Sequence, residues 1–463
     1  MDYIRSEANG QLRFETSNEK LWIPSSLYGF HNTETEVVTE ASGEIVYRIK
    51  GNIDVSEEDR ICPRCNGRMY VHNSSNEVTL RHLSLGFRRS CICFPRKQLK
   101  CSKCGKTVSQ YISFKGEGHR ITTELETYTK DLLAKSTYTL KQVGELTGLD
   151  ENTVKSIDMQ RLRERYIRDE KLIKPEEQAI YLGIDEFKLH KGQRYATHII
   201  DMETGHILWI AEGKKKQVVY DFIDHVGMEW MSHVEALACD MNSDFEEAFR
   251  EKCPNIKPVF DYFHIVKNFN DKVISEVRKE EQQRLSEEGD PEGARSLKRS
   301  KYILTSSRET LRRKDAAADN PRPEKESVFP RRTWESRNDR EARYDKLISE
   351  NKLLFTCDLI KEKLRIAYKR TDCAEMVKDI SEIISICIDT ENKHFIWFAK
   401  MLNSHFEGIV AHADYPISNG KIEGINNRIK TLRRQGYGYP DDEYFFLKLF
   451  DMSRSKDLLP TSF

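Results

Sequence analysis

Residues 180–187 of this 463-residue chain read Ile180-Tyr-Leu-Gly-Ile-Asp-Glu-Phe187, an apolar strand pattern that ends in acidic residues. Patterns of two strands, a helix, a strand, a helix and a strand follow at 195–201, 206–212, 220–226, 234–240, 245–252 and 257–260. Three consecutive strands, a crossover helix and further strands are typical of an α/β fold. We therefore predict an α/β domain in this part of the chain.

Acidic side chains end two of these strands. Asp185 and Glu186 point to opposite faces of a strand, so only one of them can serve a given site. Asp240 ends the run Val234-Glu-Ala-Leu-Ala-Cys-Asp240 in the same way. Two carboxylates at strand ends can lie side by side in one sheet, where a divalent cation would relieve their repulsion. The alternative for each is an ordinary turn or helix-cap aspartate.

A capped helix is predicted between Tyr415 and Tyr439, where a Gly-Tyr-Gly-Tyr-Pro sequence ends it. Ser418 or Asn419 can cap its first turn. An apolar stripe at helical spacing comprises Ile422, Ile425, Ile429 and Leu432. An adjacent polar stripe comprises Glu423, Asn427, Lys430 and Arg434. The polar stripe would offer a metal ligand followed by phosphate-binding groups, and a solvated amphipathic helix is the alternative.

The charges of the chain cancel overall but are unevenly distributed. The sequence holds 75 Lys or Arg and 75 Asp or Glu. Residues 1–60 contain six basic and twelve acidic residues and form an acidic leader. Residues 61–120 contain twelve basic residues against only Glu77 and Glu117.

This basic excess predicts phosphate contacts and a salt-sensitive affinity for nucleic acid. Candidate DNA-binding residues in the basic module are Arg88, Arg89 and Lys97. The alternative is a basic face that merely docks on the acidic leader.

Four of the eleven cysteines form a paired motif, Cys62-Pro-Arg-Cys65 and Cys101-Ser-Lys-Cys104. Four thiolates at this spacing predict a structural zinc site with no open position for a substrate, and a strand hairpin would fill the interval between the pairs. Free buried cysteines are the alternative. Cys91 and Cys93 alternate with apolar residues in a strand pattern and are not counted as ligands.

Residues 140–165 are typical of a helix-turn-helix, with a first helix at Leu140–Thr147, a turn at Gly148-Leu149-Asp150 and a second helix from Glu151. Asp150 suits the N-cap of the second helix. The predicted apolar contacts are Val143, Leu146, Leu149, Val154 and Ile157. The residues predicted to face the major groove are Asn152, Thr153, Lys155 and Ser156. An ordinary helical hairpin is the alternative.

The remaining sequence features argue against a secreted or membrane-spanning protein. The N-terminus carries Asp2 and Glu7 without an apolar h-region, and no apolar stretch approaches the roughly 18 residues of a membrane span. A soluble, intracellular protein with no membrane partner is expected. Residues 271–401 are typical of helices with charged links, and 296–332 look like an insertion or arm because they lack a long apolar face.

Together these features resemble the ISL-three group of insertion-sequence transposases with a DDE catalytic core. The resemblance covers about Cys62 to Tyr439 and rests on the two CxxC pairs, the helix-turn-helix and several short motifs. These motifs are Gly183-Ile-Asp185-Glu-Phe with Arg194-Tyr-Ala, Asp240-Met, Asp261-Tyr-Phe-His264-Ile-Val-Lys267 and Ser418-Asn-Gly420-Lys-Ile-Glu423-Gly-Ile-Asn-Asn427.

The resemblance implies an α/β, ribonuclease-H-like catalytic core that is interrupted by a helical insertion and preceded by a zinc-binding module and a helix-turn-helix. The implied domains are the acidic leader 1–60, a basic zinc-binding module 61–115, a helix-turn-helix DNA-binding domain 116–172, the first part of the core 178–271, the helical insertion 272–405 and the C-terminal part of the core 406–463. It also implies catalytic Mg²⁺ or Mn²⁺ bound by Asp185, Asp240 and Glu423, with Asp261 and His264 as supporting residues.

The implied activity is metal-dependent cleavage at transposon ends followed by transfer of the exposed 3′-hydroxyl to target DNA. The expected partners are double-stranded DNA and a second copy of the chain, in the bacterial cytoplasm and on the nucleoid when DNA is bound. Two alternatives remain open. One is a zinc and helix-turn-helix regulator derived from a transposase and lacking catalysis, and the other is a nuclease that cleaves without joining strands.

Overall fold

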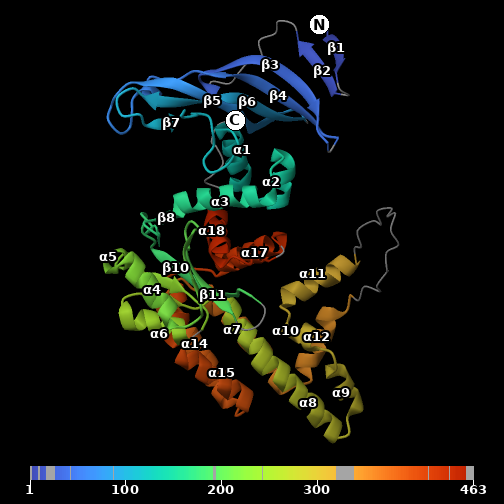
Figure 1. Cartoon of the computed structure of the whole chain (residues 1–463). Helices are drawn as coiled ribbons and strands as arrows, with labels where there is room; N and C mark the ends of the chain where they lie inside the picture. The colour runs from blue at the N-terminus through green and yellow to red at the C-terminus, as the bar shows by residue number, and fades with distance from the viewer. Residues whose placement is uncertain are drawn as a thin grey trace. The chain divides into compact units, whose positions relative to one another are not determined.

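The computed structural model describes residues 3–8, 11–16, 27–41, 43–86, 88–190, 194–241, 243–319, 338–415, 417–436 and 438–454. The chain forms two compact units, the first made of Met1–Ile173 with Lys430–Phe463 and the second of Lys174–Ile429. Figure 1 labels their elements. Within the described ranges, no helix combines the length and the apolar character needed to cross a bilayer.

The first unit contains a five-stranded sheet, drawn in blue in Figure 1. Its strands in spatial order are β3 (Phe30–Thr39), β4 (Ile45–Ile53), β6 (Arg88–Cys101) and β5 (Met69–Leu85), with β7 (Thr107–Ser109) also paired to β6. A separate hairpin consists of β1 (Tyr3–Ala8) and β2 (Gln11–Thr16), and a 3-10 turn, η2, spans Glu58–Arg60. The antiparallel β5–β6 hairpin fills the interval between the two CxxC motifs, as predicted.

The acidic leader takes part in this sheet. β4 pairs in parallel with β6, so that Ile49 lies opposite Ile92. Both side chains are buried in one core with three aromatic rings, Phe30, Phe94 and Phe114. The strands predicted within the leader are therefore real but longer, and the leader supplies Leu27, Phe30, Ile49 and Ile53 to this core of nine buried residues.

The helix-turn-helix elements are confirmed at the predicted residues. The helices of this region are α1 (Thr123–Ala134), α2 (Leu140–Thr147) and α3 (Glu151–Tyr166), followed by a short hairpin of β8 (Ile167–Arg168) and β9 (Lys171–Leu172). Gly148 ends α2 with a left-handed φ of 69°, a conformation that glycine adopts without strain. Asp150 caps α3 by accepting hydrogen bonds from the next turn of backbone.

One predicted apolar contact of the helix-turn-helix is wrong. Leu146 is 49 % exposed, whereas Thr147 is buried. The buried face of α2 runs through Val143 and Thr147, which are one helical turn apart, and Leu146 lies off that face.

The C-terminal helix α18 (Asp442–Ser453) belongs to the first unit and packs on α3 through buried charges. Asp158 of α3 accepts hydrogen bonds from Lys448 at 3.0 Å and from Tyr444 at 2.7 Å, while Arg161 bridges Asp158 and Asp451. Although burial raises the pKa of the Asp158 carboxyl, Lys448 and Arg161 outweigh it and hold that pKa below its usual range. The sequence pattern gave no indication of this long-range pairing.

The second unit contains the predicted α/β sheet. Its strands are β10 (Tyr181–Lys188), β11 (Tyr195–Asp201), β12 (Ile207–Glu212), β13 (Ala236–Ala238) and β14 (Lys257–Val259). The spatial order is β12-β11-β10-β13-β14, in which the first three strands are antiparallel and β13 and β14 run parallel to β10. Helix α4 (Lys216–Val226) lies in the crossover from β12 to β13.

Helices surround the sheet and continue through the predicted helical stretch. They are α5 (Met228–Met231), α6 (Ser243–Lys252), α7 (Tyr262–Phe269), the π-helix η3 (Asn270–Ile274), α8 (Ser275–Glu287), α9 (Pro291–Leu297), α10 (Lys301–Thr305), α11 (Arg308–Asp319), α12 (Arg340–Ser349), α13 (Lys352–Ala367), α14 (Cys373–Asp389), α15 (Lys393–Ser404), α16 (Phe406–Val410) and the 3-10 turn η4 (Ala411–Ala413). These helices share one hydrophobic core with the sheet. In this core the ring centroids of Phe269 and Phe398 are 4.7 Å apart.

The described part of the predicted arm is packed rather than free. Helices α10 and α11 each contribute isolated apolar residues to the core of the second unit, where Leu304 and Leu311 are buried. No long apolar stripe is needed for that kind of burial, which is why the sequence pattern missed it. Residues 320–332 of the predicted arm lie outside the described residues.

Helix α17 (Gly420–Gln435) contributes residues to both units, with the division at Ile429. Its predicted apolar stripe is buried at Ile422, Ile425, Ile429 and Leu432. Its predicted polar stripe is exposed at Glu423, Asn427, Lys430 and Arg434. The helix ends at Gln435 before the predicted Gly-Tyr-Gly-Tyr-Pro stop, of which Tyr437 lies outside the described residues.

Candidate functional site

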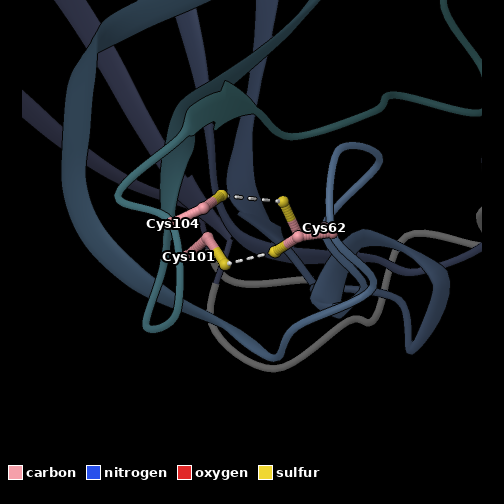
Figure 2. A group of neighbouring side chains, drawn as sticks. Cys62, Cys101 and Cys104 are labelled. Atoms are coloured by element: carbon pink, nitrogen blue, oxygen red, sulfur yellow. Dashed lines mark hydrogen bonds between the residues drawn. The ribbon is translucent and has the colours of Figure 1, made fainter.

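The four motif cysteines form a compact cluster in the first unit. The Sγ atoms of Cys62 and Cys104 lie 3.6 Å apart, as do those of Cys65 and Cys101, and all four sulfurs fall within 4.8 Å of one another. Figure 2 shows the labelled side chains turned toward a common centre. In a tetrahedral zinc site with Zn–S bonds of about 2.3 Å, the sulfurs are about 3.8 Å apart. The cluster therefore has the ligand type and the spacing of a four-thiolate zinc site.

Local backbone turns prepare this cluster. The amide of Asn66 donates to the carbonyl of Cys62, and the amide of Gly105 donates to that of Cys101, so the two motifs form matching knuckles. A Cβ atom on Gly67 would lie 3.1 Å from the sulfur of Cys101, which explains the glycine. The backbone amide of Cys104 is the main reason why the pKa of the Cys101 thiol falls to about 6, which favours the thiolate that binds zinc.

The region of Asp185 and Asp240, which we call the carboxylate edge, lies where the neighbouring strands β10 and β13 of the second unit pair in parallel. β10 and β13 pair in parallel with Gly183 opposite Ala238, and each aspartate follows two residues later. Burial raises the pKa of the Asp185 carboxyl, and the charge of Asp240 raises it further, while hydrogen bonds from the Glu186 amide and from Asn426 act in the opposite direction. Asp240 follows the end of β13 as predicted, whereas Asp185 lies within β10, which continues to Lys188, so the prediction that Asp185 ends its strand is wrong.

His264 lies beside Asp240, and Asp261 directly precedes the helix α7 that carries His264. Nε2 of His264 lies 4.0 Å from Oδ2 of Asp240. Asp261 caps α7 by accepting from the amide of Phe263, and its other oxygen accepts from the amide of Asn419 at 2.7 Å. Both residues thus connect the carboxylate edge to the segment that begins α17.

Glu423 is exposed on α17, between two asparagines that bond to these residues. Asn419 and Asn426, which precede and follow Glu423 by about one helical turn, bond to Asp261 and to Asp185 respectively. Ile422 packs against Gly183, where an added Cβ would lie 2.8 Å from the Cδ1 atom of Ile422. The helix therefore lies directly against the strand that carries Asp185.

The three carboxylates are less tightly gathered than the cysteines. Within the described residues, the cysteine cluster is the only group of three or more acidic, histidine or cysteine side chains with ligand atoms inside 4.8 Å. Like charges resist closer approach, and a cation is what would draw the carboxylates together. The buried amide oxygens Oδ1 of Asn419 and Asn426 make no hydrogen bond in the described part of the chain. Carboxylate oxygens are donors that Mg²⁺ and Mn²⁺ prefer, so the three carboxylates fit such an ion.

Sequence patterns missed Asn426 and Gly183 as site residues. Asn426 directly precedes Asn427, which the polar stripe favoured, but Asn426 is the one that donates to Asp185 at 2.6 Å. The signal that could have found it is its spacing of seven residues from Asn419 and three from Glu423, which places all three on one helical face.

The predicted DNA-binding residues of the basic module contact the leader instead of standing free. Arg89 forms an ion pair with Glu44, Arg88 donates to the hydroxyl of Tyr47 at 3.4 Å, and Lys97 donates to the carbonyl of Ile53 at 3.1 Å. For these three residues the observed contacts agree with a basic face that docks on the acidic leader.

The predicted groove-facing residues lie at the start of α3. Asn152 is exposed, and the backbone amide of Thr153 is held by the cap Asp150. Lys155 forms an ion pair with Asp441 at 3.0 Å and lies over the ring of Tyr444 at 5.2 Å. Lys155 is thus engaged within the first unit, whereas Asn152 presents its side chain to solvent.

Comparison with known proteins adds three similarities. Residues 182–449, more than half of the chain, match the family model of DDE-type ISL3 transposases, the ISL-three group. The chain is 28 % identical over 396 residues to the transposase for insertion sequence element IS1001 of Bordetella parapertussis, which is 84 % of this chain and 87 % of the relative. It is 24 % identical over 263 residues, 56 % of each chain, to the transposase for insertion sequence element IS1557 of Mycobacterium tuberculosis.

Proposed function

The chain belongs to the ISL3 family of DDE-type transposases, and from this premise we propose that it cleaves and joins DNA strands at the ends of an insertion sequence. In this proposal Asp185, Asp240 and Glu423 are the carboxylates that bind catalytic Mg²⁺ or Mn²⁺. The single observation that carries the assignment is the parallel register that sets Asp185 beside Asp240, with the Glu423 helix hydrogen-bonded to Asp185.

The second unit is proposed to be a ribonuclease-H-like core. In support, three antiparallel strands precede two parallel ones, and the first aspartate lies on the first strand of this sheet while the second follows the fourth. The late carboxylate Glu423 comes after a long helical stretch, in keeping with a core interrupted by an insertion. The order of elements and the order of carboxylates therefore agree with each other.

For phosphodiester cleavage and joining, the main contribution of the protein is to position charged groups and the metal ions that they would bind. Two divalent ions held by such carboxylates stabilise the attacking and leaving oxygens of a phosphodiester. Asp185 is held in place by hydrogen bonds to both of its oxygens, at 2.7 Å from Glu186 N and 2.6 Å from Asn426 Nδ2. Each oxygen keeps a lone pair for an ion. Lys430 and Arg434, further along the exposed stripe of α17, are proposed with Asn427 to bind the DNA backbone.

The first unit is proposed to recognise the transposon ends. Its cysteine cluster would bind structural zinc and stiffen the sheet, and α3 would enter the major groove with Asn152 and Thr153. Family members act on two DNA ends, so a homodimer on DNA is part of the proposal.

Strand joining distinguishes this proposal from its alternatives. Intact and pre-cleaved element ends are each mixed with target DNA, the full chain and Mg²⁺, and the cleaved and joined products are measured on a denaturing gel. A transposase yields joined product that Asp185→Asn abolishes, while Asp224→Asn, an exposed aspartate of α4, serves as the matched control. End binding without cleavage by the wild type would identify a regulator, and cleavage without joining would identify a nuclease.

A further inference from the structure

Asn419, which directly precedes α17, and Asn426 of α17 lie on either side of Glu423 and bond to groups at the other two carboxylates. Asn426 Nδ2 donates to Oδ2 of Asp185 at 2.6 Å. Asn419 Nδ2 donates to Nδ1 of His264 at 3.2 Å, and Nε2 of the same ring faces Asp240. Residues 419, 423 and 426 share one helical face, so one helix carries Glu423 together with both connections.

We propose that Asn419 and Asn426 are positioning residues that fix Glu423 relative to Asp185 and Asp240, so that the three carboxylates come within range of a shared divalent cation. This inference rests on the proposed function, because it presumes that the carboxylates bind the metal. In this scheme the two asparagines do not bind the metal directly, but they determine the affinity of the site for the metal.

Asn426 is suited to hold an ionised carboxylate. Its Nδ2 group can only donate, and Asp185 can only accept when ionised, so the pair has one favourable orientation. The hydrogen bond favours the charged form of a carboxylate whose burial opposes ionisation. An aspartate in place of Asn426 would instead set a second negative charge against Asp185.

Asn419 fixes both the start of α17 and the state of a histidine ring. Its backbone amide bonds to Asp261, the cap of α7, at 2.7 Å. Because Nδ1 of His264 accepts from the amide of Asn419, the proton of the neutral ring is on Nε2, the atom that lies 4.0 Å from the Asp240 carboxylate. At 4.0 Å the two atoms are too far apart for a direct hydrogen bond, so the ring is set to donate toward Asp240 through one water.

Side chains that orient metal ligands typically affect metal affinity by about 10-fold to 100-fold. A loss in that range, without a loss of fold, is what separates a positioning role from a structural one. Gln435 offers a matched control, since it is an exposed amide at the far end of the same helix.

The test measures Mn²⁺ binding to the full, zinc-loaded chain by electron paramagnetic resonance and calorimetry. Asn426→Ala and Asn419→Ala are expected to weaken Mn²⁺ binding by about 10-fold to 100-fold, while Gln435→Ala binds as the wild type does. Strand joining by the two alanine variants should recover as Mn²⁺ is raised, whereas Asp185→Asn should not recover. Asn426→Leu, which keeps the size but removes the donor, covers the case in which alanine disturbs packing.

Wild-type Mn²⁺ affinity in Asn426→Ala, Asn426→Leu and Asn419→Ala would overturn the inference and leave the proposed function intact. If the wild type and Asp185→Asn bind Mn²⁺ equally and neither joins strands, the proposed function itself is overturned. The two failures are thus distinguishable in one set of measurements.

Discussion

The cysteine cluster and the carboxylate edge both hold potential metal ligands, but they are built differently. The four sulfurs lie within 4.8 Å of one another and are oriented by turns of a few residues. The carboxylates come from a strand, from the end of another strand and from a helix, and hydrogen-bonded asparagines tie that helix to the edge. The first arrangement suits an ion that stays bound, and the second suits an ion that must exchange and admit a substrate.

The difference follows from charge and chain distance. Backbone amides of Cys104 and Lys103, in the same knuckle, favour the thiolate form of Cys101, so this ligand is prepared locally. At the carboxylate edge, burial and Asp240 together raise the pKa of Asp185, so ionisation there costs free energy until a cation binds. Removing a ligand should therefore unfold one region and only inactivate the other.

The largest expected effect is on the cysteine side. Cys101→Ser should abolish zinc binding, from about one ion per chain to none, and remove the cooperative unfolding transition of the first unit. Metal analysis and differential scanning calorimetry measure both. Cys91→Ser is the control, because Cys91 lies on β6 outside the cluster. A normal transition in Cys101→Ser would show that the cluster is not a structural metal site.

Asp240→Asn, in contrast to Cys101→Ser, should remove strand-joining activity without lowering the stability of the fold. Strand joining is expected to fall about 1,000-fold or more, since lost metal ligation removes several kcal/mol of transition-state stabilisation. The melting temperature should equal or exceed that of the wild type, because a negative charge next to Asp185 is gone. Single-turnover joining assays measure the rate, and thermal melts measure the melting temperature. A substantially lower melting temperature would contradict the expectation that losing a carboxylate inactivates the protein without unfolding it.

Gly183→Ala tests whether α17 must lie against β10. An alanine Cβ would lie 2.5 Å from the sulfur of Met202 and 2.8 Å from Cδ1 of Ile422, so these side chains, or the helix that carries Ile422, must shift. Overpacking of this kind costs about 1–3 kcal/mol, and we expect joining to fall by about 10-fold to 100-fold. Gly424→Ala is the matched control on α17, where an added Cβ meets nothing within 4 Å and helix propensity favours alanine.

The smallest effect concerns the surface around the cysteine cluster. Arg89 is paired with Glu44 on the same sheet, so Arg89→Ala should change affinity for end DNA by about twofold or less and leave its salt dependence unchanged. Arg64, exposed within the first knuckle, is the comparison. Fluorescence anisotropy at several salt concentrations checks both, and a salt slope lowered by about one in Arg89→Ala would return Arg89 to the DNA-binding set.

The candidate site was largely predictable where residues are close in sequence. The CxxC pairs and the helix-turn-helix bounds follow from spacing, capping and turn residues, which act over a few positions. Asp185 and Asp240 could be named as candidate carboxylates, but no pattern gave the register that sets them side by side. Asn426 was missed because the polar stripe drew attention to its neighbour Asn427, and only the packing of Ile422 on Gly183 decides which asparagine faces the sheet.

By itself, the sequence determined the kinds of element, their order and the chemical groups they carry, because hydrophobic period, caps and ligand spacing are local properties. Only the tertiary structure decided which distant segments meet. It joined the acidic leader to the basic module, α18 to α3 and α17 to the carboxylate edge. These pairings depend on burying particular apolar and charged surfaces against each other, and a periodic pattern specifies that a face will be buried without specifying its partner.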